Sequence, residues 1–274
     1  MPYCLHYRIF LPIGIMLFLF TACDDDQNKK QPDQLLQQQS QQQGYPVLIA
    51  TPEAADYSLP FCEKQYCIEI EIQAFHSQDQ WFNQITNQQI AELIRKQLGL
   101  KQKLTLQQAV DTFIQQSDLW QQQHPQSKPW SLYIQSKVPM QHQEMTLLQL
   151  ESQYQIADQQ IPAEHYFFML DRKRHQILRL YDVIKPEKRI EFGQFIQQSY
   201  QQWKQKLSAT QSQNTPATLY WANQDWYVDE QGIVIYYRAS DLQLTQQRVL
   251  EISLTTEQAK QWLNVDILQQ LSLY

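Results

Sequence analysis

An abrupt change of hydrophobic period near residue 76 constrains the fold more than any other feature of the sequence. Residues 66–75 read YCIEIEIQAF and alternate apolar with polar side chains, which is the period of a strand with one buried face. From Phe82 to Leu98 the apolar positions recur every three or four residues, as in an amphipathic helix, and Gly99 follows as a stop signal. A chain that joins a half-buried strand directly to an amphipathic helix is typical of an α+β domain.

The rest of the chain extends this pattern. We expect Ser77 to begin the first helix, with Gln80 completing a capping box. The fold class predicted is therefore α+β, with antiparallel sheets and amphipathic helices packed on one face. The further elements expected are a helix from Thr105 to before Pro125, strands 130–138 and 144–155 turning around Pro139, two strands within 165–180, a helix at 189–207, a polar loop at 208–217, a hairpin at 225–237 turning at Gly232, a strand at 249–254 and a helix capped by Thr255 and Gln258.

The N-terminus carries the pattern of an export signal. Residues 9–20 form an apolar run behind Arg8 that is shorter than the about 20 residues needed to span a bilayer. The run fits the central region of a secretory signal peptide, and Phe20-Thr21-Ala22-Cys23 resembles a bacterial lipobox. We therefore expect residues 1–22 to be removed and Cys23 to carry lipid, including palmitate. The alternative, a buried cysteine ending a core helix, is disfavoured because Asp24 to Asp26 would be buried unpaired.

A flexible tether is expected between the lipid and the folded domain. Glutamine makes up close to one residue in five, and residues 24–44 combine glutamines with charges and almost no apolar side chains. This predicts a lipidated, Gln-rich tether at 23–45 and an α+β domain at 46–274. Acids directly after a lipidated cysteine favour retention in the inner membrane of Gram-negative cells. The expected location is thus the cell envelope, lipid-anchored and facing the periplasm.

The four cysteines support an exported protein. Cys4 would leave with the signal peptide and Cys23 would take the lipid, so that Cys62 and Cys67 remain. An even remainder in an exported chain predicts one disulfide. The alternatives are reduced or metal-binding thiols, and neither a CxxC pair nor a histidine cluster lies nearby. A loop this short would add roughly 2 kcal/mol of stability in the chain-entropy model.

The sequence offers no recognisable catalytic motif. It has no nucleophile elbow, phosphate loop, dinucleotide fingerprint or zinc motif, and its histidines are scattered. The segment 142–144 (HQE) falls in an expected turn, and Glu69 and Glu71 are expected on a solvated strand face. With only 5 glycines, the chain has few places where backbone could enclose a ligand. We expect no enzyme activity, no cofactor and no metal.

Aromatic residues around the last hairpin are the other candidate signal. Trp221, Trp226, Tyr236 and Tyr237 lie where both faces of the hairpin carry apolar side chains. If exposed, they would form a binding surface for sugar or protein. The alternative is that helices cover one face of the sheet and bury them.

Three segments carry a family resemblance. The alternating strand precedes WFNQITNQQI, and the segments YFFMLDRKRHQILRLYDVI and DWYVDEQGIVIYYRASDL, the latter followed by LEISLTTEQAKQWL, come later. Together, over about residues 66 to 264, they resemble the extracytoplasmic domain shared by the anti-sigma factor RsiV and the peptidoglycan deacetylase PdaC. The chain departs from the family at 238–243, which lacks the usual turn rich in proline, aromatic residues and glycine.

The resemblance implies a binding module. The sequence shows neither a sigma-binding segment with a transmembrane helix nor a deacetylase domain, so a sensor or binding role on a lipid tether is expected. The implied partner is a lysozyme-type muramidase or peptidoglycan. The alternatives are an envelope enzyme acting on cell-wall glycan and a structural assembly lipoprotein. The net charge is −6, and loss of Arg8 would make it −7, which disfavours nucleic acid and favours a basic protein.

The lipid assignment depends on one thiol. Cys23→Ser should abolish membrane fractionation and leave an unprocessed precursor, because the substituted residue cannot form the thioether. Fractionation and labelling with radioactive palmitate, compared with the unmodified chain, measure this. Palmitate incorporation into the variant would contradict the assignment.

Overall fold

The computed structural model describes residues 45–62, 67–157, 159–244 and 248–273. The expected signal peptide, the lipidation site at Cys23 and the tether up to residue 44 lie outside the described residues. Everything described belongs to one unit, residues 44–274, and both hydrophobic cores lie within it.

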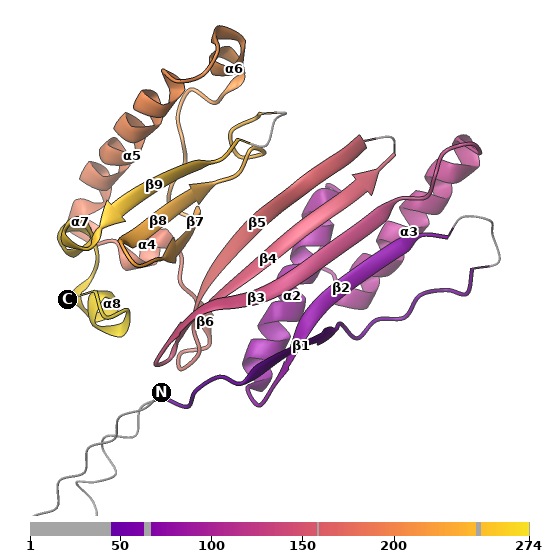
Figure 1. Ribbon diagram of the computed structural model, residues 1–274, viewed down its shortest axis with the longest axis horizontal. Helices are drawn as coiled ribbons and strands as arrows, with labels where there is room; N and C mark the ends of the chain where they lie inside the picture. The colour runs from indigo at the N-terminus through magenta and orange to yellow at the C-terminus, as the bar shows by residue number, and fades with distance from the viewer. Residues whose placement is uncertain (1–44, 63–66, 158, 245–247, 274) are drawn as a thin grey trace, which may run out of the picture. The chain divides into compact units, whose positions relative to one another are not determined.

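The larger of two sheets has six strands in chain order (Figure 1). Its strands are β1 (Ala50–Ala54), β2 (Glu69–Ser77), β3 (Ser131–His142), β4 (Met145–Ile156), β5 (Gln159–Asp171) and β6 (Gln176–Ile177). All neighbours are antiparallel except β2 and β3, which run parallel from the Glu69–Ser131 pair onward. Parallel neighbours need a long crossover, and here two helices provide it. The predicted α+β class is confirmed, with this one parallel pair as a departure from the antiparallel pattern.

The crossover helices begin and end at local signals. The helices are α2 (Gln80–Gln97) and α3 (Leu106–Gln123). Thr105 and Gln108 form a complete capping box before α3. The expectation that Ser77 begins α2 is wrong, because Asp79 Oδ1 accepts the first free amide, that of Phe82, at 3.0 Å. The Ser77 hydroxyl instead lies 2.7 Å from Asn83 Oδ1, at the end of β2.

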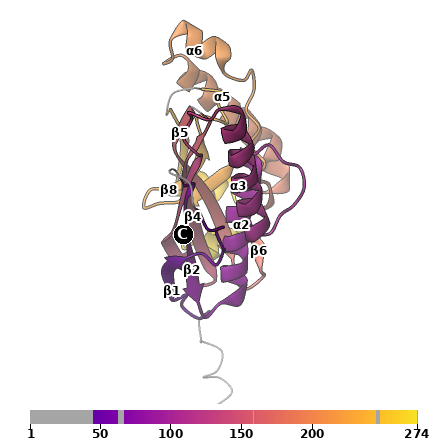
Figure 2. The ribbon, with the colours of Figure 1, turned by 90° about the vertical axis from the view of Figure 1, so that its right-hand side faces the viewer.

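Both crossover helices cover the same face of the six-stranded sheet (Figure 2). Their apolar stripes meet the even-numbered side chains of β2 and β3 in the first core. Its fully enclosed members, 0–1 % exposed, include Phe82, Ile90, Ile94, Ala109, Val110, Phe113, Leu132, Ile134, Leu148, Leu150 and Leu170. The intervening side chains at the starts of β2 and β3, such as Glu69, Glu71 and Tyr133, therefore lie on the opposite, polar face.

The second half of the chain builds a three-stranded antiparallel sheet with helices of its own. Its elements are β7 (Asp225–Val228), β8 (Gly232–Tyr237), β9 (Leu250–Thr255), α4 (Leu180–Val183), a 3₁₀ turn (Pro186–Lys188), α5 (Arg189–Lys204), α6 (Ala209–Asn214), α7 (Thr256–Trp262) and α8 (Val265–Gln270). The helices α5 and α7 pack on this sheet around Phe192, Tyr200 and Ala259. Met145, Leu147 and Met169 join this second core from β4 and β5. Alternate side chains of β4 and β5 thus serve two different cores.

Several boundaries differ from the sequence expectations. The β3–β4 turn lies at Gln143 and Glu144, while Pro139 sits inside β3 where the register shifts. A proline is tolerated there because a bulge needs no ladder hydrogen bond from its nitrogen. The expected loop 208–217 contains α6, which begins at a Ser208–Gln211 capping box. Strand β1 and helix α8 carry too few periodic apolar positions to be expected from the pattern.

The start of the described chain is fastened to the end of β5. Arg172 is 2 % exposed, and its Nη2 donates to Pro46 O at 2.9 Å. The Tyr45 hydroxyl donates to Arg172 O at 3.1 Å, and the Arg172 guanidinium lies 4.8 Å from the Tyr45 ring centre. The Arg172 Nε also pairs with Asp79 at 2.9 Å. One arginine therefore binds both the N-cap residue of α2 and the chain segment Tyr45–Pro46. We call Tyr45, Pro46, Asp79 and Arg172 the N-terminal clasp.

The predicted disulfide is present in the structure. Cys62 is bonded to Cys67, five residues further along the chain. The bond closes a loop next to the start of β2 and does not touch either core. It is therefore a local constraint, as its short loop implies.

Gly232 provides a stability test with a matched control. Its φ is +147°, and an added Cβ would clash with the backbone oxygen of Leu254. Gly232→Ala should lower the free energy of unfolding by about 3 kcal/mol or more, since it adds both strain and overlap. Gly99 has φ +67° with nothing within 4 Å of an added Cβ, so Gly99→Ala should cost only about 1 to 2 kcal/mol. Equal costs in urea unfolding would contradict the close approach.

Candidate functional site

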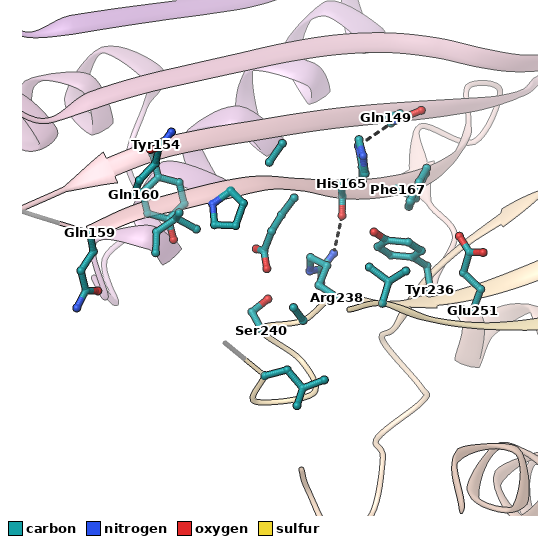
Figure 3. Close-up of a pocket in the computed structure, with 17 residues that line it drawn as sticks. Gln149, Tyr154, Gln159, Gln160, His165, Phe167, Tyr236, Arg238, Ser240 and Glu251 are labelled. Carbon is teal, nitrogen blue, oxygen red and sulfur yellow. Dashed lines mark hydrogen bonds between the residues drawn. The ribbon is translucent and has the colours of Figure 1, made fainter. Parts of the chain in front are cut away.

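A cleft of about 960 Å³ lies between the first half of β5 and the β8–β9 side of the small sheet (Figure 3). Residues 159–165 form one wall without interruption, and Arg238 to Ser240 form the other. Tyr236 and Phe167 lie together at one end, while Tyr154 and Gln160 lie at the other end. The lining combines aromatic rings, amides and a few charged groups, which is typical of ligand-binding cavities.

A buried ion pair holds the two walls together. Asp225 of β7 and Arg238 after β8 pair at 2.5 Å, and both side chains are less than 15 % exposed. Asp225 Oδ2 also accepts the Phe167 amide at 2.9 Å. Arg238 Nη1 donates to the His165 carbonyl at 3.3 Å, as the dashed line in Figure 3 shows. The carboxylate of Asp225 and the guanidinium of Arg238 therefore hydrogen-bond the Phe167 amide and the His165 carbonyl of β5. A neighbouring strand would otherwise bind these two groups.

The electrostatics of this pair are dominated by its burial. Loss of solvent raises the pKa of Asp225, and the attraction of Arg238 offsets only part of that effect. Burial alone would lower the pKa of Arg238, but the charges of Asp225 and Asp241 raise it above its ordinary value. Arg238 stays charged, and its anionic partners, Asp225 and Asp241, are already in place.

The charge of Arg238 is already compensated by two carboxylates of the protein. Besides Asp225, it faces Asp241 at 3.3 Å, and its guanidinium lies 4.4 Å from the Tyr166 ring centre. Asp241 Oδ2 also accepts the Arg238 backbone amide at 2.9 Å. The arginine is thus a structural part of the wall, and it does not make the cleft an anion site.

The aromatic end of the cleft is a packed cluster. Phe167 contacts Tyr227 and Tyr236 at centroid distances of 4.6 and 4.9 Å. Burial raises the pKa of Tyr236 to about 12, and it also raises that of Tyr227, so both stay neutral near pH 7. The Tyr227 hydroxyl donates to Glu251 at 3.2 Å. Of this cluster, Phe167 and Tyr236 line the cleft, together with Glu251, which already accepts the Tyr227 hydroxyl.

The remaining ionisable groups of the cleft are also engaged. His165 Nδ1 lies 3.2 Å from the Gln149 amide nitrogen and 4.0 Å from Glu151. Glu164 accepts the Tyr166 hydroxyl at 3.0 Å. No nucleophile is paired with a base along the described lining. His165 is the one histidine that lies in this cleft, which the scattered sequence positions did not indicate.

The candidate aromatic surface at Trp221, Trp226, Tyr236 and Tyr237 does not form. Trp226, Tyr236 and Tyr237 are 1–4 % exposed, and Trp221 packs partly buried against the second core. The alternative reading is the one that the structure shows, because α5 and α7 cover one face of the small sheet and β5 covers part of the other. Trp226 Nε1 donates to Leu178 O at 2.9 Å inside the core. Tyr236 alone of the four lines the cleft.

The described ranges contain neither a metal-binding cluster nor a membrane-spanning helix. No group of three or more His, Cys, Asp or Glu side chains there is placed to hold a metal ion. No helix in that part of the chain is both long and apolar enough to cross a membrane.

Sequence reasoning missed the residues that build the cleft. Tyr154, Gln160 and Phe167 belong to strands whose patterns predict only burial or exposure. Arg238 lies in the segment that departs from the family pattern, and the structure places that segment in the cleft wall. The departure was the one available signal, and it indicated the region without indicating the ion pair.

Comparison with known proteins addresses the fold. The chain is an α+β domain with a six-stranded mixed sheet and a three-stranded antiparallel sheet. It is similar to a DUF3298 family protein from Pseudomonas aeruginosa PAO1, with TM-score 0.57 and 16 % identity over 81 % of this chain and 94 % of that one. It is also similar to a DUF3298 family member from Bacteroides fragilis NCTC 9343, with TM-score 0.56 and 12 % identity over 84 % of this chain and 99 % of that one.

These likenesses establish a shared fold and go no further. DUF3298 is related to the extracytoplasmic domain that the sequence resembles, so the resemblance is supported at the level of fold. The sequence matches no protein-family model and no curated protein.

The buried pair provides a test of how the cleft is built. Asp225→Ala should lower the free energy of unfolding by about 3 to 5 kcal/mol, because it leaves Arg238 and the Phe167 amide short of a partner. Glu191→Ala removes one partner of the exposed Lys188–Glu191 pair and should change stability by less than about 1 kcal/mol. Urea unfolding of both variants gives the comparison. A small loss for Asp225→Ala would show that the pair does not hold β5.

Proposed function

We propose that this protein is a non-enzymatic, lipid-anchored module that faces the periplasm and binds a component of peptidoglycan in the cleft beside β5. The lipid anchor and the location rest on Cys23 and the signal-like sequence before it. The binding role rests on the cleft. The resemblance to an extracytoplasmic domain, supported by the shared fold, is consistent with both.

One observation carries the proposal. The cleft is concave and lined by rings and amides; Arg238 is paired with carboxylates, and Glu164 and Glu251 each accept a tyrosine hydroxyl. Such a lining suits a neutral ligand with hydroxyl and amide groups. The sugars of peptidoglycan have this chemistry, with N-acetyl amides and hydroxyl groups on apolar ring faces.

An envelope enzyme acting on cell-wall glycan is the alternative reading of the same cleft. Catalysis of glycoside cleavage uses two carboxyl groups that are free to act as acid and base or nucleophile. Here Glu164 and Glu251, the two carboxylates of the described lining, each accept a tyrosine hydroxyl. The contacts therefore favour binding over catalysis.

A muramidase of the lysozyme type is a second candidate partner, and charge favours it. The polar face of the large sheet carries Glu69, Glu71 and Glu151, and the whole chain has a net charge of −6. A basic protein would be attracted to this face, and the attraction would weaken as salt rises. The cleft argues for a ligand that enters it, so we rank peptidoglycan first.

The binding role can be tested with soluble peptidoglycan fragments. Calorimetry with the purified, processed protein in mild detergent should show saturable binding without release of smaller fragments. Parallel titrations with a basic lysozyme at low and high salt test the second candidate. Binding of neither, together with glycan cleavage, would establish the enzyme reading instead.

A further inference from the structure

A second cavity adjoins the cleft on the polar face of the large sheet. It measures about 600 Å³ and is formed by the start of β2, the start of β3 and the end of β4. Glu69, Ser131 and Tyr133 lie on its floor, on the side of the sheet away from α2 and α3. The function proposed above does not use this cavity.

The two cavities share part of their walls. Tyr154 and Gln160 line both of them. In Figure 3 these two side chains lie next to each other at the end of the cleft opposite Tyr236. The shared residues place the two cavities next to each other, and we call the pair of cavities the groove.

The junction is rich in free amides. Gln153 lines the second cavity, Gln159 lines the first, and Gln160 lines both. All three are exposed, and their side chains make no hydrogen bond within the residues that the structure describes. A glutamine amide both donates and accepts, so it can pair with an N-acetyl amide or a sugar hydroxyl.

The lining of the second cavity includes one acidic and one basic side chain, Glu69 and Lys128. Glu69 accepts the Tyr133 hydroxyl, which raises the pKa of Tyr133 to about 12. Lys128 is an exposed cation at its edge. The groove as a whole thus continues the chemistry of the first cavity, with rings and amides at intervals along its length.

Size indicates how much ligand the groove can hold. Single small-molecule sites measure roughly 300–1,000 Å³, and each of the two cavities falls in that range. A disaccharide is a ligand of that size. A linear polymer whose repeating units each present an amide would fill both cavities and pass Tyr154 and Gln160 at the junction.

We infer that the two cavities are consecutive subsites of one groove that binds a linear, N-acetylated glycan lengthwise. This inference rests on the proposed function and adds the orientation and length of the ligand. An extended peptide is the other polymer with regular amides, but the rings of Phe167 and Tyr236, which meet edge to face in the cleft lining, favour the apolar faces of sugars.

The test is a chain-length series. N-Acetylglucosamine oligomers of two, four and six units are titrated into the processed protein in mild detergent. The disaccharide should bind within the first cavity, and the tetrasaccharide should bind about tenfold tighter, because it reaches the second subsite. The hexasaccharide should add little beyond the tetrasaccharide.

Variants at exposed glutamines separate the two subsites. Gln153→Ala should weaken tetrasaccharide binding about 3- to 10-fold, the loss expected for one hydrogen bond, and leave disaccharide binding unchanged. Gln159→Ala should weaken both ligands. Gln135→Ala is the matched control, since Gln135 is exposed on β3 outside both cavities, and it should change neither.

The outcomes distinguish this inference from the proposed function. Equal affinities for all oligomers would overturn the two-subsite groove and leave peptidoglycan binding in place. Binding of peptidoglycan stem peptides without binding of any oligomer would overturn the glycan assignment. Absence of binding to oligomers, peptides and peptidoglycan fragments would overturn the inference and the proposed function together.

Discussion

The pair between Asp225 and Arg238 is the interaction on which the rest of the structure depends. It lies at the open edge of β5, where the large sheet would otherwise present unpaired amides and carbonyls. Open edges invite pairing with other chains, and proteins cover them in various ways. Here two side chains from a distant hairpin cover the edge, and in doing so they fix the small sheet against the large one. The cleft exists because the pair spans the edge at one level and leaves residues 159–165 beside an open space.

Burying the Asp225–Arg238 pair costs hydration free energy, and the contacts that the pair makes with β5 fit only one register of that strand. A buried ion pair gains little over a well-packed apolar contact, because both charges lose their hydration. Asp225 and Arg238 recover part of that loss through the Phe167 amide, the His165 carbonyl and Asp241. The geometry tolerates no register shift of β5, since the donor and acceptor backbone groups must meet one carboxylate and one guanidinium. We interpret the pair as a device that selects one register, at some expense of stability.

Local features of this fold could be predicted from sequence, and its long-range features could not. The alternating strand before α2, the capping residues Thr105 and Thr255 and the turn at Gly232 depend on neighbours within a few positions, and each was predicted. Asp225 meets Phe167 across 58 residues, and no periodicity marks such a meeting. Whether the aromatic residues of the last hairpin are exposed or buried stayed open for the same reason, because their cover comes from other parts of the chain. The cleft is built from strand edges and a loop that are distant in sequence, so the sequence pattern did not predict it.

The N-terminal clasp has a mechanical consequence. Any pull on the chain ahead of Tyr45 enters the domain at Pro46 and Arg172, and then passes into the Asp79 cap and the β1–β2 pair. All of these groups border the first core, and Asp225 and Arg238 are not among them. If the chain is tethered to a membrane as its sequence suggests, tension would load one end of the large sheet in shear. The groove would then keep its shape while the tether is stretched, so that a bound ligand would not be released by tension on the tether.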